Sequence, residues 1–112
     1  MEPSKKTRKQ QKQEILKLLE NKRYLERAVV VLFYRQTLDE RLSKETLHDN
    51  GVGFAGNDAR RGTYLAKLIL EYHAKGWEYG NILIGRGYEM AKTMMPRYWK
   101  QLAAAKAQKE GI

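Results

Sequence analysis

The chain has 112 residues, 42% of them hydrophobic, which is enough for one domain with a modest core. It has no cysteine, and this excludes disulfides, thiolate catalysis and thiolate metal sites. The formal net charge is +9, and the longest apolar run, residues 28–34, is far shorter than the roughly 18 residues that a membrane span requires. The N-terminus is charged and has no hydrophobic signal region. We therefore expect a soluble, cytoplasmic protein.

The excess positive charge lies at the two ends of the chain. Residues 1–12 and residues 86–112 each have a balance of +4, whereas the residues between them have only +1. Basic ends are typical of proteins that contact nucleic-acid phosphates or anionic lipids, although they can also serve only solubility. Residues 1–7 are polar and basic and are predicted to be a disordered arm.

Two helices are predicted in the first half of the chain. Ile15, Leu18 and Leu19 recur at helical spacing and indicate a helix over residues 8–21, with a break at Asn21. The second helix is predicted over 23–41. Its run Val29–Phe33 has strand propensity, but the 3.6-residue pattern continues on both sides of it. Its inward face is expected to hold Leu25, Ala28, Val29, Leu32, Phe33 and Gln36.

A glycine-rich loop is predicted over residues 49–57. Ser43 is expected to cap a short helical turn ahead of it, through Leu47. Within the loop, glycines and asparagines supply positive-φ positions, and Val52 and Phe54 are expected to insert into the core. Gln36 and Thr37 are expected to hydrogen-bond the loop backbone.

Two further helices complete the predicted fold. The third covers 58–74, capped by Asn57 or Asp58, with Gly62 explained by a close helix crossing; its inward residues are Tyr64, Leu65, Leu68, Ile69 and Tyr72. Lys75-Gly76 ends it, and a turn over 77–81 follows. The fourth covers 85–108 and is kinked or split by Pro96; its apolar stripe is Ala91, Met94 or Met95, Tyr98, Leu102 and Ala105. The expected fold is an all-α, single-domain bundle over residues 8–108, with a frayed tail at 109–112.

Three segments together resemble a small helical domain of phages and other mobile elements, over about residues 23–103. They are residues 32–40, then Thr46 with 50–54 and 58–59, then 96–102, the last reading Pro-Arg-Tyr-Trp-Lys-Gln-Leu. Gly85 and Gly87 depart from the resemblance, since stronger helix formers are expected there. The resemblance implies a genomic context rather than a mechanism. It also implies that such a protein could inhibit a host defence complex.

The candidate nucleic-acid-binding residues fall into three groups. In the last helix Arg97-Tyr98-Trp99-Lys100 alternates cations and rings, and Lys92, Trp99 and Lys106 share one face at seven-residue spacing. In the third helix the candidates are Arg60 and Arg61, with Lys67 nearby, beside the backbone amides of the first turn. The N-terminal group comprises Lys5, Lys6, Arg8, Lys9 and Lys12.

Each group also has a purely structural interpretation. Trp99 could belong to the core, and Arg60 or Arg61 could pair with Asp58 or Glu71. The loop glycines lack the spacing and the Lys-Ser/Thr end of a nucleotide-hydrolysing loop. His48 and His73 have no metal-ligand spacing, and no serine or threonine stands in a recognisable nucleophile motif. We therefore expect no metal, no cofactor and no enzymatic activity.

The leading hypothesis is a non-enzymatic nucleic-acid-binding module, for which DNA is the more expected ligand than RNA. The alternative is a phage-encoded inhibitor, similar in role to anti-CRISPR proteins, that docks on a host nucleoprotein defence complex. A peripheral membrane binder is disfavoured because the basic arm lacks an apolar face. A homo-oligomer is left open, with Trp77, Tyr79 and Trp99 as candidate interface residues.

Overall fold

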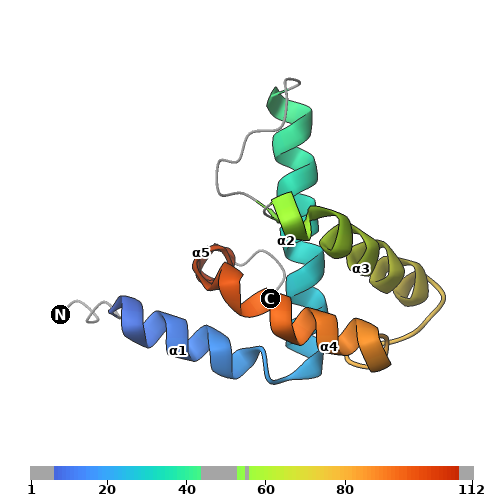
Figure 1. The fold of residues 1–112 in the computed structure, drawn as a ribbon, viewed down its shortest axis with the longest axis horizontal. Helices are drawn as coiled ribbons and strands as arrows, with labels where there is room; N and C mark the ends of the chain where they lie inside the picture. The colour runs from blue at the N-terminus through green and yellow to red at the C-terminus, as the bar shows by residue number, and fades with distance from the viewer. Residues whose placement is uncertain (1–6, 44–52, 55, 109–112) are drawn as a thin grey trace.

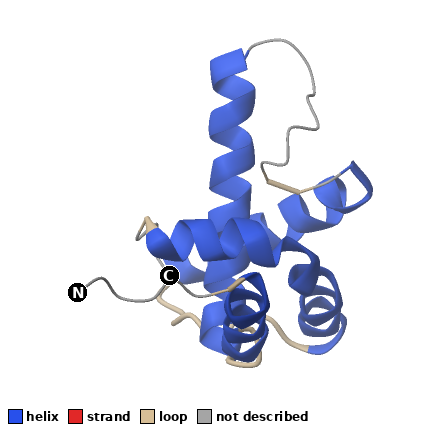
Figure 2. Cartoon of the chain, turned by 90° about the vertical axis from the view of Figure 1, so that its left-hand side faces the viewer, coloured by secondary structure: helices blue, strands red, loops and turns tan. Residues whose placement is uncertain are grey.

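The computed structural model describes residues 7–43, 53–54 and 56–108, and this part of the chain is helical with no strand. In chain order the elements are α1 (Arg8–Leu18), α2 (Lys22–Ser43), α3 (Gly56–Ala74), α4 (Gly85–Met94), the 3-10 turn η1 (Met95–Tyr98) and α5 (Trp99–Ala107). Figure 1 shows α2 through the centre of the molecule, with α1 and α5 on one side and α3 on the other. The far end of α2 projects beyond the other helices (Figure 2). The predicted all-α bundle is confirmed.

The start of each of the first two helices is fixed by a polar side chain. The Thr7 hydroxyl accepts a hydrogen bond from the Gln10 amide at 3.1 Å, while the Gln10 side chain accepts one from the Thr7 amide at 2.9 Å. Thr7, the last residue of the predicted arm, is therefore the N-cap of α1, and residues 1–6 lie outside the described ranges. Asn21 Oδ1 accepts from the Arg23 amide at 2.9 Å, which confirms the predicted break there.

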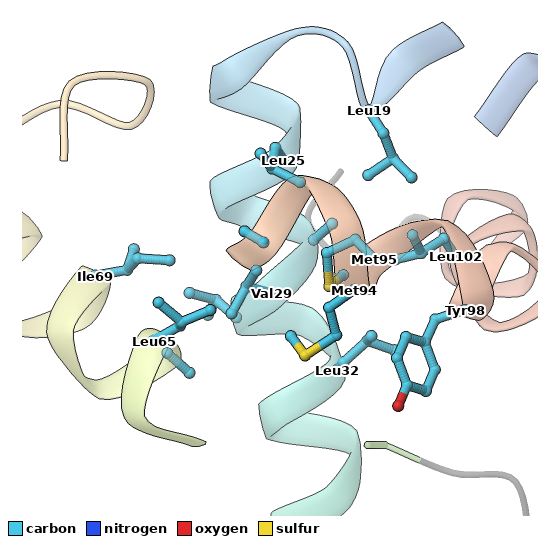
Figure 3. Close-up of a cluster of buried hydrophobic side chains, with 14 of the residues drawn as sticks. Leu19, Leu25, Val29, Leu32, Leu65, Ile69, Met94, Met95, Tyr98 and Leu102 are labelled. Carbon is cyan, nitrogen blue, oxygen red and sulfur yellow. The ribbon is translucent and has the colours of Figure 1, made fainter. Parts of the chain in front are cut away.

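The core lies where α2 meets the other helices (Figure 3). Val29 to Leu32 are all buried inside a helix, as the flanking periodicity predicts. The stripe predicted for the last helix is also buried throughout, and both Met94 and Met95 belong to it. Side chains from all the described helical elements contribute to it, among them Leu19, Leu25, Leu32, Leu65, Ile69, Met95, Tyr98 and Leu102.

The orientation of α3 differs from the prediction. Leu65 and Ile69 are buried as expected, but Tyr64 is 59% exposed and Tyr72 is 36% exposed. Ala66 takes part in the core in their place. Tyr64 lies about 140° around the helix from Ile69, at 100° per residue, so the two cannot both face inward. In the sequence, the large aromatic side chains of Tyr64 and Tyr72 indicate a core-facing position more strongly than the small side chain of Ala66 does.

The start of α3 also differs from the prediction. The helix begins at Gly56, so Asn57 and Asp58 lie inside its first turn and neither precedes it as a cap. Gly62 is explained by a close contact, though with a ring rather than a helix. A Cβ atom at Gly62 would lie 2.5 Å from the Phe54 ring, which is itself buried in the core as predicted.

Two other predictions concern the ends of helices. Ser43 is the last residue of α2. The helical turn predicted after it, through Leu47, and Val52 of the predicted loop lie outside the described ranges. At the other end of the chain, Pro96 divides the predicted helix as expected. It stands in η1, and the chain turns there: α4 lies across the view in Figure 1, whereas α5 is seen nearly end-on.

A buried carboxylate joins α2 to the segment that connects α3 and α4. Glu26 is fully buried, and its side chain accepts three backbone hydrogen bonds. The donors are the amides of Gly80 at 2.7 Å, Ile82 at 3.0 Å and Leu83 at 2.7 Å. The three amides replace the water that a carboxylate would otherwise bind, so burial of Glu26 requires them to stay in place. The carboxylate thereby fixes the path of the connecting segment across α2.

Candidate nucleic-acid interface

The two ends of the described chain pack against each other and leave a groove between α1 and α5. Arg8 and Gln11 line it from α1; Trp99, Lys100, Ala103, Ala104 and Ala107 line it from α5, around a hollow of about 320 Å³. A second hollow of about 220 Å³ continues along the same seam beside Glu14 and Lys106. Alanines on α5 leave this space open because their side chains are short. We call the first hollow the α1/α5 groove.

Two cations, Arg8 and Lys100, line this groove, and further exposed cations lie on α1. Arg8, Lys9 and Lys12 are exposed on α1, and within the described ranges none of them is in an ion pair. The one acidic side chain on α1, Glu14, forms an ion pair with Lys106 of α5 instead. Lys100 lies over the Trp99 ring, with its Nζ 5.9 Å from the ring centroid. The groove therefore combines cations with an aromatic ring that already contacts one of them.

Trp99 fits both interpretations considered above. It is partly buried and packs against the core, and it also lines the groove. Its neighbour Tyr98 is buried on the apolar stripe, as the helical spacing predicts. Trp99 is thus a ring held by the core on one side and available to a ligand on the other.

Arg97, the other basic residue of the segment 97–100, forms an ion pair within the fold. Its Nη1 donates to Asp58 Oδ2 at 3.1 Å, although the arginine side chain remains 61% exposed. The Tyr98 hydroxyl donates to the same oxygen at 2.6 Å. Asp58 is buried, and these two donors tie α3 to η1.

Lys92 lies on α4 and does not share a face with Trp99, because the chain turns at η1 between α4 and α5. Lys106 lies on α5 seven residues after Trp99, so this pair keeps the predicted spacing. Lys106 pairs with Glu14 along the seam. Lys92 Nζ lies 5.2 Å from the centroid of the Tyr88 ring, and Lys22 Nζ lies 5.3 Å from the same centroid. The prediction of one continuous basic face is therefore wrong. Lys5 and Lys6 lie outside the described residues.

Arg60 and Arg61 are exposed on α3, away from the α1/α5 groove (Figure 1). The predicted structural alternative does not hold within the described ranges, since Asp58 pairs with Arg97 and Glu71 pairs with Lys75. Asp58 also places a carboxylate in the first turn of α3. That negative charge does not suit a phosphate bound at the start of the helix, so a role for the two arginines has to come from the outer surface of α3.

A glutamine of the segment 96–102, to which the sequence assigns no role, helps to position α5. Gln101 accepts a hydrogen bond from the Gly53 amide at 2.8 Å and donates to the Gly53 carbonyl at 2.9 Å. Gln36 accepts from the Phe54 amide at 3.1 Å, as predicted; the side chain of Thr37 is outside the description. Arg35 donates to the Gln101 carbonyl at 2.9 Å. Gly53 has φ +78° and lies so close to Gln36 that a Cβ atom would not fit, so this position requires glycine.

The described part of the chain offers neither a metal site nor a membrane-spanning helix. No group of histidine and acidic side chains there could hold a metal ion. None of the helices described is both long enough and apolar enough to span a bilayer.

Comparison with protein families, with curated protein sequences and with solved structures finds no match for this chain. The resemblance to a phage and mobile-element domain therefore stays a prediction.

Proposed function

We propose that this protein is a non-enzymatic nucleic-acid-binding module that holds a strand in the α1/α5 groove. One observation carries the proposal: the fold brings Arg8, from one basic end of the chain, to the same groove as Trp99 and Lys100, from the other. One cation from each of the two basic ends thus lies at the same surface. Cations that follow a strand beside an aromatic ring are the usual means of binding single-stranded nucleic acid.

Each component of the groove has a chemical role in this proposal. Arg8, Lys9, Lys12 and Lys100 contact phosphates, and their binding energy comes largely from the release of counterions. Trp99 stacks on a base, and Lys100 lies where the phosphate beside that base would pass. Lys5 and Lys6 precede Arg8 in sequence and extend the positive charge beyond the start of α1.

The direct test uses Trp99 as its own reporter. The chain has two tryptophans, so Trp77→Phe leaves Trp99 as the only one. Titration of this variant with an oligothymidine should quench its fluorescence, because a stacked base quenches indole emission. Parallel titrations with RNA and with duplex DNA rank the three ligands, and the hypothesis of DNA preference predicts weaker binding of RNA.

Charge reversals locate the site on the surface. Arg8→Glu and Lys100→Glu should each weaken binding about tenfold or more at low salt and reduce the slope of log K against log salt by about 0.7 or more. Lys17→Glu is the matched control: it makes the same change in net charge on α1, but Lys17 lies about 180° around the helix from Arg8. Equal losses in all three variants would show attraction by net charge alone and would refute the groove.

The contribution of the ring is tested with Trp99→Leu, because alanine would also remove packing against the core. Leucine keeps apolar volume but cannot stack, so affinity for a labelled oligothymidine should fall by about 1–3 kcal/mol. Circular dichroism must show unchanged helicity. If the wild type binds no nucleic acid, the inhibitor hypothesis becomes the leading one. Its test is recovery of a host protein from nuclease-treated lysate.

A further inference from the structure

A second basic and aromatic surface lies on the outside of α3. Arg60, Tyr64 and Lys67 follow one another at spacings of four and three residues, so they share one face of the helix, and Arg61 lies beside them. All four side chains are exposed. We call this surface the α3 stripe. From Arg60 to Lys67 the helix rises by seven residues at 1.5 Å each, which is about 10 Å. This length corresponds to about three phosphate spacings of 3.4 Å along one strand.

Within the described part of the chain, these side chains form no ion pair and no contact between rings or between a cation and a ring. None of the three cations of the stripe forms an ion pair there. The nearest acidic group along the same face, Glu71, pairs with Lys75 at 3.4 Å. Tyr64 is 59% exposed, and its ring makes no aromatic or cation contact with the described residues. A large ring placed outward between three unpaired cations is a surface suited to an anionic polymer with sugars and bases.

The position of this stripe separates it from the α1/α5 groove. In Figure 1 α1 and α5 lie on one side of α2 and α3 lies on the other, along the longest dimension of the molecule, which is 46 Å. The stripe also faces away from the core that joins α3 to α2, because Leu65, Ala66 and Ile69 occupy the opposite side of the helix. The two surfaces therefore face different directions.

We propose that the α3 stripe binds a second nucleic-acid segment, so that one protein molecule bridges two segments. Arg60, Arg61 and Lys67 contact its phosphates, and Tyr64 packs against a sugar or donates its hydroxyl hydrogen to a phosphate oxygen. This inference rests on the proposed function of the α1/α5 groove and adds an activity to it: the protein joins nucleic acids as well as binding them.

A bridging experiment tests the proposal. Biotinylated oligothymidine is fixed on beads, protein is added, and recovery of a dye-labelled oligothymidine from solution is measured; the two probes cannot anneal. The wild type should retain the labelled probe, with recovery that rises and then falls as protein concentration increases. That maximum is the behaviour of a monomer with two sites, because excess protein occupies each probe separately. The free protein should sediment as a monomer.

Variants separate the two sites. Arg60→Glu combined with Lys67→Glu should reduce retention of the labelled probe about tenfold or more while the fluorescence titration of Trp99 changes about threefold or less. The control is Lys17→Glu combined with Arg86→Glu, which makes the same change in net charge at exposed positions outside both surfaces. Tyr64→Ala should reduce retention without changing helicity.

The outcomes distinguish the two proposals. Bridging that survives the α3 double variant, or that requires a protein dimer, overturns this inference. So does a wild type that binds one probe and never retains the second, although the α1/α5 groove then stands. A wild type that binds neither probe overturns the inference and the proposed function together.

Discussion

Replacement of Glu26 by glutamine should destabilise the protein by about 2–4 kcal/mol. The carboxylate accepts one backbone hydrogen bond at Oε1 and two at Oε2, all from amides of the segment between α3 and α4. A glutamine can place its single oxygen at the Oε2 position, but its NH₂ group then faces the Gly80 amide, so two donors oppose each other. One charge-assisted bond worth about 1.5–3 kcal/mol is lost, and the two that remain become weaker neutral bonds.

Thermal unfolding followed by circular dichroism measures this effect. For a domain of this size about 1 kcal/mol corresponds to roughly 4–8 °C, so the melting temperature should fall by on the order of 10–20 °C. Glu20→Gln is the control, since Glu20 is exposed and its replacement should change the free energy of unfolding by less than about 0.5 kcal/mol. A loss below about 1 kcal/mol in Glu26→Gln would refute the reasoning. It would mean that desolvation of the buried carboxylate cancels what the three amides provide.

Three further substitutions test other contacts by the same melting assay. Tyr98→Phe should cost about 1.5–3 kcal/mol, because it removes the 2.6 Å hydrogen bond to buried Asp58 and keeps the ring; an unchanged melting temperature would contradict this. Gly62→Ala should cost about 1–3 kcal/mol, because the new Cβ atom would lie 2.5 Å from the Phe54 ring, and a stable variant would show that the ring can move. Tyr24→Phe should be neutral or slightly stabilising, since within the described residues the buried Tyr24 hydroxyl has no hydrogen-bond partner. Burial, and secondly the charge of Glu14, raises the pKa of Tyr24 from 10.0 to about 12, which favours the protonated form in the folded state. Its contribution to stability is therefore complete below pH 10 and lost between pH 10 and 12, so the wild type should lose more stability than Tyr24→Phe over that interval.

The parts of the fold that could be predicted from sequence are those that local pattern determines. Val29–Phe33 is helical because the periodicity around it exceeds the length of a strand, and Asn21 and Pro96 interrupt helices through their own local chemistry. Which face of α3 turns inward is decided by tertiary packing. Its register is set by what fits beside Phe54 and α2, and there Gly62 and Ala66 matter more than Tyr64.

The candidate site could be predicted as a set of residues but not as a surface. Arg8, Trp99 and Lys100 are candidates from charge and aromatic content, yet no spacing indicates that α1 packs on α5. Lys92 and Trp99 would share a face only on one straight helix, and the turn at η1 separates them. The sequence indicates no role for Glu26 or Gln101, because a buried acceptor for backbone amides is recognisable only when the segment that supplies those amides is in place.

The packing of α1 on α5 has a consequence for the order in which the protein forms. Glu14 and Lys106 are 92 residues apart, so their contact closes almost the whole chain into a loop. Contacts of such high sequence separation form late, because the entropy of loop closure is lost before they contribute. During synthesis α1 emerges from the ribosome before the other described helices, so it has no partner until α5 has emerged as well. The groove therefore does not exist on a nascent chain that lacks α5, and any binding activity that depends on it cannot begin earlier.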